Sequence, residues 1–287
     1  MVDRFRRYLP TTEQPIFRRA VIAAAFSPRL TAVLNEAFHF ISLTGAEAVV
    51  VHVGLEDEST QRQLVESLEK SFFKDKIPEF VIEGGNAADA LLRSARKVEA
   101  DLIIAGALAK EALFRYYLGS VARSLARHAA CSVLLLTDPQ ERPKSFTNIH
   151  CAVEFHQGCE KAVQVAADLS WVLRSRHLYF THSFVATEYG VKKSNESAAE
   201  EIRTLYGLAD EKLRAFLQAN HLSDADYEMR SLVETSQMTT MSFSRDVQAD
   251  LFIIHGPTDR FSLWNRMFAQ DLEMTLQHLP CSLLLTR

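Results

Sequence analysis

The chain has 287 residues, of which 47% are hydrophobic and 24% charged, and its formal net charge is −4. These values are typical of a globular protein with a full core, long enough for one large domain or two of ordinary size. The acidic balance argues against a general nucleic-acid binder or a protein of acidic membranes, because such partners require a basic surface. No stretch approaches the roughly 18 apolar residues of a membrane span. The first residues also lack the apolar segment of a secretory signal, so none is expected.

The four cysteines are few for this length and show no CxxC spacing, which is the usage of a reduced cytoplasmic protein. We therefore expect a cytoplasmic location. His150, Cys151, His156 and Cys159 lie close together in the sequence. Neighbouring residues of a strand face opposite sides, however, and no paired spacing here matches a zinc site. No metal is expected.

Short apolar runs alternate with longer segments of helical periodicity along the first half of the chain. The runs that we predict as strands are 20–26, 46–53, 79–82, 102–106 and 132–136. The segments that we predict as helices are 28–43, 59–73, 86–97 and 120–128. Runs that are apolar on both faces are typical of parallel strands covered by helices on both sides of the sheet. The alternation predicts a doubly wound α/β domain with five parallel strands.

The second half shows the same alternation after a polar segment with two prolines, which we interpret as a linker. Its predicted strands lie near 149–155, 177–184, 227–232, 251–255 and 282–286. Its predicted helices lie near 159–172, 197–219, 235–246 and 269–278. The expected organisation is an N-terminal extension at 1–15, a first domain at 16–138, the linker at 139–146 and a second domain at 147–287.

The two halves also repeat each other residue by residue, which is the sign of a duplication. The segment 98–106 matches 247–256, since each leads from an acidic residue into a short apolar run that ends at a glycine. Further along, Gly106 lies as far from Cys131 as Gly256 lies from Cys281.

Two further matches lie upstream. Residues 23–26 correspond to 152–155, and both segments end in a phenylalanine. His52 and His182 each end the second apolar run of their half. At that place a histidine is either a contact to a ligand or a packed structural residue, and both interpretations remain open at this point.

Ligands of open α/β sheets bind outside the carboxyl ends of the strands, where the strand order reverses. The segment that follows the fourth predicted strand begins at Gly106, and Gly119 and Ser120 open the next predicted helix. Glycine lets the backbone approach a phosphate closely, and the free amides at a helix start stabilise an anion. Ser120 can cap the helix or donate its hydroxyl to a phosphate oxygen.

This segment resembles the ATP-binding signature of universal stress proteins, strand–G-x2-G-x9-G-S/T. Gly106, Gly119 and Ser120 stand at the required spacings, and Ala109 stands at the middle glycine of the signature. The resemblance continues through a Val-Ala pair and a later His-x2-Cys-x-Val before the last strand. It covers both halves, nearly the entire chain beyond the first fifteen residues.

The resemblance implies a nucleotide, ATP or AMP, in the first domain, with the adenine near the ends of the first and second strands. It places Ala25, where the family has an aspartate, and the backbone of Val53 beside the nucleoside. It places Gly106, Gly119, Ser120 and Val121 around the phosphates. The second domain has Asp259 at the middle glycine, with Ala269 and Gln270 in place of the Gly-Ser pair. A carboxylate there repels phosphate oxygens, so no nucleotide is expected in the second domain.

The last predicted strand of each half, 133–136 and 283–285, is rich in leucine. An apolar edge strand must be covered, and domains of the family that this chain resembles pair through their last strands. The two halves are therefore expected to pair as an intrachain pseudo-dimer, with further dimerisation left open. Covalent linkage raises their effective concentration for this pairing.

The function that the resemblance implies is a ligand-responsive regulatory module of the stress response, with an adenine nucleotide or another small ligand as partner. Neither nucleic acid nor membrane is an expected partner, and the protein partners are left open. One alternative is an interaction scaffold without nucleotide. Another is a weak ATP hydrolase, although the sequence carries neither an SGGxDS nor an HxGH signature and no catalytic residue is assigned.

Overall fold

A computed structural model describes residues 15–107, 119–156, 158–184, 197–222, 227–234, 239–256, 276 and 279–287. The chain divides into two compact units. The first unit contains the described residues up to Ser145 together with the last segment, which begins at Leu276. The second unit contains the described residues from Phe146 to Gly256.

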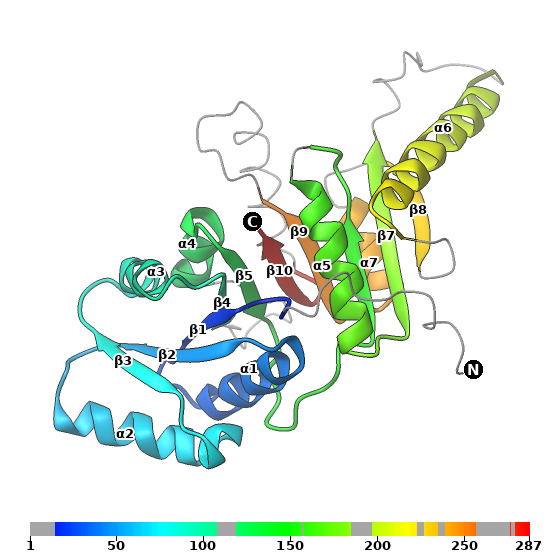
Figure 1. Ribbon diagram of the computed structural model, residues 1–287. Helices are drawn as coiled ribbons and strands as arrows, with labels where there is room; N and C mark the ends of the chain where they lie inside the picture. Colours follow the sequence, from blue (N-terminus) through cyan, green and yellow to red (C-terminus); the bar gives the residue numbers. More distant parts are fainter. Residues whose placement is uncertain are drawn as a thin grey trace. The chain divides into compact units, whose positions relative to one another are not determined.

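The first unit is built on a sheet whose strand order is β3-β2-β1-β4-β5-β10. The first five strands are parallel, and β10, the last strand of the chain, runs antiparallel to β5 (Figure 1). The strands are β1 (Arg19–Ala23), β2 (Glu47–Val53), β3 (Glu79–Glu83), β4 (Leu102–Gly106), β5 (Ser132–Leu136) and β10 (Ser282–Thr286). The strand order reverses between β1 and β4, which is where a ligand is expected in this class of sheet.

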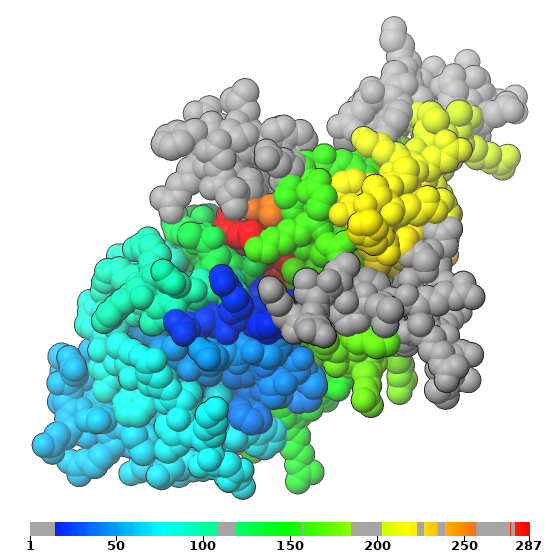
Figure 2. All heavy atoms as spheres, in the orientation of Figure 1, coloured from blue at the N-terminus to red at the C-terminus, as the bar shows by residue number. Residues whose placement is uncertain are grey.

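Helices cover both faces of this sheet, with α1 and α2 on one side and α3 and α4 on the other (Figure 1). The helical elements are α1 (Leu30–Thr44), α2 (Glu58–Glu69), the 3₁₀ turn η1 (Phe72–Asp75), α3 (Ala87–Lys97) and α4 (Ser120–His128). Side chains cap the starts of three of them: Asp57 accepts a hydrogen bond from the N–H of Thr60 in α2, Ser71 accepts one from the first residues of η1, and Asn86 accepts them from the first residues of α3. α2 buries only Leu64 and Leu68, and its outer residues lie on the surface in Figure 2.

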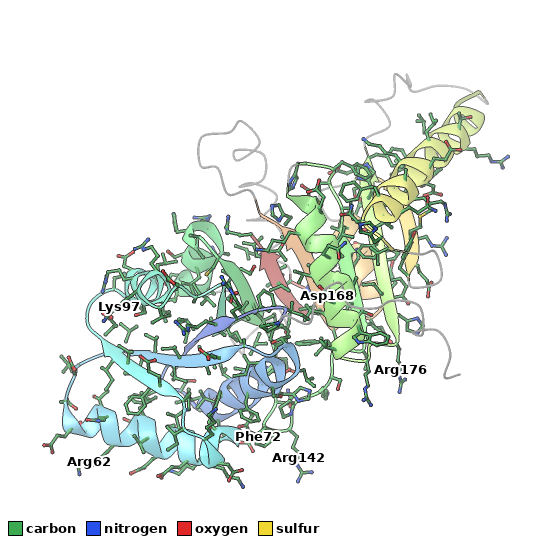
Figure 3. All side chains as sticks on the ribbon, viewed as in Figure 1. Arg62, Phe72, Lys97, Arg142, Asp168 and Arg176 are labelled. Atoms are coloured by element: carbon green, nitrogen blue, oxygen red, sulfur yellow. The ribbon has the colours of Figure 1, made fainter. Side chains whose placement is uncertain are left out.

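The segment after β5 is held against α1 by hydrogen bonds. The carboxylate of Glu36 accepts a hydrogen bond from the backbone N–H of Gln140 at 3.2 Å, and Asn35 donates to the carbonyl oxygen of Glu141 at 2.8 Å. Glu36 is buried, and burial raises the pKa of its carboxyl above the usual value. Farther along, Arg142 extends outward from the segment (Figure 3). The predicted linker therefore includes residues that belong to the packing of the first unit.

The second unit contains four parallel strands in the order β9-β6-β7-β8. The strands are β6 (Asn148–Ala152), β7 (His177–Phe184), β8 (Glu228–Val233) and β9 (Leu251–His255). The helices are α5 (Cys159–Val172), α6 (Ser197–Ala219) and α7 (Thr239–Asp246), with α7 on the opposite face of the sheet from α5 and α6 (Figure 1). Here the strand order reverses between β6 and β9.

The predicted fold class is confirmed, with a mostly parallel sheet flanked by helices and with the two leucine-rich strands β5 and β10 paired. Two predicted strands end early, because β1 stops at Ala23 and β6 stops at Ala152. After Ala152 the chain turns away through Phe155, whose φ is 55°. The helix predicted at 269–278 lies outside the described residues except for Leu276. No helix in the part of the chain that the structure describes is long and apolar enough to cross a membrane.

The duplication is visible in matched hydrogen bonds at the amino ends of the sheets. In the first unit the carboxylate of Asp101 accepts hydrogen bonds from the backbone N–H groups of Arg18 and Arg19. In the second, Asp250 accepts them from Thr147 and Asn148. Each aspartate ties the segment before its fourth strand to the start of the first strand of its half.

The strand register corrects one match made from the sequence. Leu102 of β4 lies opposite Ala20, and Leu251 of β9 lies opposite Ile149, which is the corresponding position in β6. Counted from these pairs, Gly106 corresponds to His255 rather than to Gly256. The match to Gly256 was wrong because the second copy has one residue more between its aspartate and its glycine.

Candidate functional site

The residues predicted to hold a ligand lie at the carboxyl edge of the first unit's sheet. Gly106 is the last residue of β4 and Val53 is the last residue of β2. Ala25 follows β1 and is exposed. The helix α4 leads into the amino end of β5, so its own first residues lie at the same carboxyl edge as Gly106. Ala109 lies outside the described residues.

The start of α4 has the properties of an anion site. Gly119 is the residue before the helix, and as a glycine it has no side chain that could cap the first amides. The first turn of α4 contains no acidic residue, and the side chain of Ser120 is exposed. The N–H groups of a first helical turn carry partial positive charge and bind anions when no side chain engages them. Val121 is half-buried beside them.

Gly106 has a packing reason in addition to the predicted role. A Cβ atom at this position would lie 2.9 Å from Cγ2 of Val33 in α1. A side chain at the end of β4 would therefore push α1 away from the sheet. The glycine thus lets α1 pack closely on the end of β4, whether or not a ligand binds nearby.

The ends of β1 and β2, where the resemblance implies the adenine, are joined by a histidine. The imidazole Nδ1 of His52 lies 2.7 Å from the carbonyl oxygen of Ala24, so this nitrogen carries the proton and donates. The ring of Phe26 stacks on the imidazole, with centroids 4.0 Å apart and an interplanar angle of 28°. In the same region the N–H of Gly54 donates to the carbonyl oxygen of Glu83. These backbone groups are occupied within the protein.

The second unit contains the same arrangement. His182 donates from Nδ1 to the carbonyl oxygen of Val153 at 2.8 Å, and the ring of Phe155 lies 4.2 Å from its imidazole. Because this half lacks the Gly-Ser pair of the signature, an arrangement common to both halves does not depend on a nucleotide. Of the two interpretations left open for His52 and His182, the structure supports the packed structural one.

At the switch point of the second unit two imidazole rings lie side by side. His255, the last residue of β9, is buried with 6% of its surface exposed. Its ring lies 5.3 Å from the ring of His156, and His156 Nε2 lies 3.4 Å from a carboxylate oxygen of Glu154. Glu154 stands where the first half has Ala25. Among the described residues no group of three His, Cys, Asp or Glu side chains is placed to hold a metal ion.

His150 lies in the core of the second unit and not in the crevice. Its Nδ1 is 2.6 Å from the hydroxyl of Ser244, and its Nε2 is 2.7 Å from the hydroxyl of Thr181. Complete burial lowers the pKa of its imidazole to about 3. Cys151, the next residue, has a thiol pKa raised by burial. Both groups are uncharged at neutral pH and fill the core.

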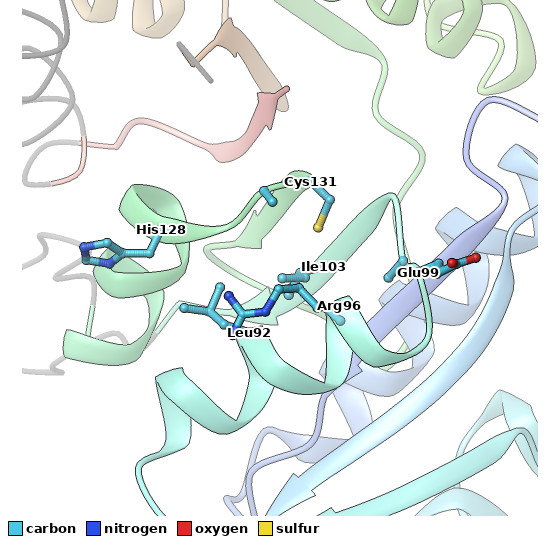
Figure 4. A pocket seen from close by; sticks show the side chains of 9 residues that line it. Leu92, Arg96, Glu99, Ile103, His128 and Cys131 are labelled. Atoms are coloured by element: carbon cyan, nitrogen blue, oxygen red, sulfur yellow. The ribbon is translucent and has the colours of Figure 1, made fainter. Parts of the chain in front are cut away.

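A small pocket lies elsewhere in the first unit, between α3 and the turn that follows α4 (Figure 4). It is lined by Leu92, Arg96, Ile103, His128 and Cys131, among others. Ile103 is near the start of β4 and Cys131 directly precedes β5, so the pocket opens at the amino edge of the sheet, opposite the predicted site. Its volume of about 100 Å³ is well below the roughly 300 Å³ of small-molecule sites. It is too small for a nucleotide.

Sequence reasoning identified the residues of the α4 start but missed the contacts of His52 and His255. The contact of His52 could have been predicted, because Phe26 and His52 both have counterparts in the second half of the sequence. The role of His255 was hidden because the glycine beside it was matched to Gly106. Only the strand register separates these two positions.

Comparison with known proteins agrees with this description. Residues 54–137 match the universal stress protein family. Among curated proteins no match is found. A protein of unknown function from Pseudomonas aeruginosa PAO1 has a solved structure with a TM-score of 0.70 and 14% identity, covering 94% of this chain and 92% of that one.

Two further solved structures extend the comparison. A universal stress protein from Archaeoglobus fulgidus DSM 4304 has a TM-score of 0.65 and 12% identity, covering 93% of this chain and 98% of that one. The cytoplasmic domain of a prokaryotic cation chloride cotransporter has a TM-score of 0.51 and 12% identity, covering 93% and 94%. At these identities the likeness shows the fold alone, and the same fold serves proteins of different kinds.

Proposed function

The chain carries a universal stress protein domain, and from that premise we propose that its first unit binds an adenine nucleotide, ATP or AMP, at the start of α4. The observation that carries the proposal is the helix start itself. Gly119 has no side chain to cap the amides that follow it, no acid stands in the first turn, and the adjacent strand ends at Gly106, which has no side chain of its own.

The proposed site differs from the family signature at two positions, and each difference weakens binding without abolishing it. Ala25 offers a methyl group where an aspartate would accept a hydrogen bond, a loss of about 0.5–1.5 kcal/mol. Ala109 adds a Cβ, which costs on the order of 1 kcal/mol if the backbone there is left-handed. Together these losses lower affinity by up to about a hundredfold. We therefore expect weak binding that responds to the cellular nucleotide concentration.

The biological role that follows is regulatory. We propose a cytoplasmic tandem protein of the stress response, with a domain at 16–138 that reads the nucleotide and a domain at 147–287 that does not. The pairing of β5 with β10 supports the pseudo-dimer, because it ties the end of the chain to the first unit.

Two variants at one position test the nucleotide site. Gly119 has φ −62° and ψ 161°, an extended conformation that any residue can adopt. Asp and Asn are both favoured at this helix position, so Gly119→Asp and Gly119→Asn should fold. Asp places a carboxylate where the phosphates are expected, and Asn places an uncharged group of the same shape there.

Calorimetric titration of the full chain with ATP and AMP is the measurement. Wild type should bind in the range of about 0.01–1 mM. Gly119→Asp should lose at least about tenfold in affinity, and Gly119→Asn should lose less. The proposal is overturned if wild type shows no heat of binding and an acid extract of the purified protein contains no ATP, ADP or AMP. That result would favour the scaffold without nucleotide.

A further inference from the structure

His255 lies where the second unit would hold a ligand. The strand order of this unit reverses between β6 and β9, and His255 is the residue at the carboxyl end of β9. In the first unit the corresponding position is Gly106, which has no side chain. The second copy therefore has an imidazole ring at the strand end where the first copy has no side chain and Val33 packs against the glycine.

The ring is packed and does not project into solvent. Only 6% of the surface of His255 is exposed. A Cβ atom added at Gly158 would clash with its Nε2 and lie 2.9 Å from its Cε1. The imidazole thus lies directly over the residue that precedes α5, and His156 borders it on another side. Gly158 has φ 92°, a conformation that favours glycine, and the absent side chain provides the room for the ring.

Residues around this ring are smaller in the second unit than at the corresponding positions of the first unit. The residue before the helix is Arg29 in α1 and Gly158 in α5. The fourth residue of the helix is Val33 in α1 and Ala162 in α5, and α5 packs against β9. Val33 is the side chain that a Cβ at Gly106 would strike. The second unit thus has the smaller residue, Ala162, on the helix that packs against β9, and the larger residue, His255, at the end of that strand.

We propose that His255 is a built-in occupant of the second crevice, which closes that unit to ligand and restricts binding to the first unit. This inference rests on the proposed function, because it assumes that ligands of this fold bind at the strand ends where the strand order reverses. It adds that the chain's own imidazole, buried against Gly158 and His156, takes the place of a ligand there.

Chemical rescue tests this directly in the full-length protein. His255→Gly restores the residue of the first copy and vacates the space of the ring, and His255→Phe fills the same space with a ring of similar shape. The probe is free imidazole, added in the millimolar range at about pH 8, where it is mostly neutral. Thermal unfolding is followed by tryptophan fluorescence, because Trp171 and Trp264 both belong to the second half.

The expected result is a lowered unfolding midpoint in His255→Gly that imidazole raises in a saturable way. Wild type and His255→Phe should show no such rise. The proposal is overturned if imidazole leaves folded His255→Gly unchanged, or if it shifts wild type by the same amount. Should His255→Gly not fold, His255→Ala takes its place, and failure of imidazole to restore or stabilise the folded protein counts against the proposal.

The outcome is separable from that of the nucleotide site. The affinity of the first unit for ATP is measured in the same preparations, and His255→Gly should leave it unchanged. Loss of imidazole rescue with normal ATP binding would refute the occupant alone. Rescue without any ATP binding would refute the nucleotide site alone.

Discussion

His52 donates a hydrogen bond to the carbonyl oxygen of Ala24, and the phenyl ring of Phe26 covers the imidazole that makes it. One side chain thereby joins the carboxyl ends of β1 and β2. His182 does the same for β6 and β7 through Val153 and Phe155. Retention of this arrangement in both halves, although only one retains the Gly-Ser pair, indicates that it stabilises the repeat itself.

We predict that His52→Ala and His182→Ala destabilise their units by similar amounts. Each removes one buried hydrogen bond and one ring contact, together about 1–3 kcal/mol. Hydrogen exchange of the amides of β2 and β7 measures the loss in each unit separately. A role in ligand binding predicts instead that His52→Ala lowers nucleotide affinity while the protection of β2 stays unchanged, and that result would contradict the structural role.

His150 makes the second unit sensitive to acid. Its imidazole has a pKa of about 3 when folded, because burial disfavours the charge, against about 6.5 in the unfolded chain. Between these values the unfolded state binds the additional proton, so stability is full above pH 6.5 and falls as the pH decreases toward 3. At pH 5 the expected loss is about 2 kcal/mol relative to pH 7.5.

The matched control is His150→Val, since the corresponding residue of the first half is Val21. It removes the titrating group and the hydrogen bonds of His150 to the hydroxyls of Ser244 and Thr181, so it lowers stability at neutral pH. Its urea midpoint should depend less on pH between 7.5 and 5 than that of wild type. An equal pH dependence in both proteins would show that His150 is not the group responsible.

The strands and helices were largely predictable because their apolar patterns are strong. The bounds of β4, β5 and α4 were predicted to the residue, since a polar or glycine residue stands at each end. The carboxyl ends of β1 and β6 were predicted too long, because Phe26 and Phe155 are apolar yet pack on histidines outside the sheet. Apolarity alone does not distinguish a strand residue from a ring that covers a strand end.

The candidate site was predictable only in part, and for a different reason. Gly106, Gly119 and Ser120 were identified because glycines and helix starts have local signatures. His255 and Gly158 lie far apart in sequence, and their fit depends on the register between β6 and β9. A register shift of one residue changes which side chain faces the crevice, and a matched glycine in the sequence concealed that shift.

Glu36 gives the first unit a pH dependence of opposite sign. Burial raises the pKa of its carboxyl, with a smaller contribution from Asp138, so the folded state holds its proton to higher pH than the unfolded state. Stability therefore decreases as the pH rises through this interval. Glu36→Gln retains an oxygen that accepts the N–H of Gln140 and removes the buried charge, so it should be more stable than wild type at pH 7.

Urea unfolding at pH 7 and pH 4.5, monitored by hydrogen exchange in α1, measures this difference. Glu141→Gln is the control, because Glu141 lies in the same segment with an exposed side chain and contributes only its carbonyl oxygen to Asn35. Its stability should follow that of wild type. A Glu36→Gln protein that is less stable than wild type at pH 7 would show that the ionised carboxylate is favourable there.

The last strand, β10, should stabilise the first unit through its pairing with β5. Leu283, Leu284 and Leu285 of β10 are fully buried and lie opposite Leu135, Leu134 and Val133 of β5. Deletion of residues 282–287 removes about 5 kcal/mol or more of apolar burial, a large part of the stability of an ordinary domain. It also exposes β5 as an unpaired apolar edge, which favours aggregation.

Amide exchange in β5 and light scattering test this in the truncated chain. The amides of β5 should lose protection and the protein should self-associate, whereas Arg287→Ala, which retains all three leucines, should keep a protected β5. Leu284→Asp distinguishes loss of the apolar contact from loss of chain length. It keeps all residues of β10 but buries a carboxylate opposite Leu134. If the amides of β5 stay protected after the deletion, the prediction is wrong, and the first unit is stable without β10.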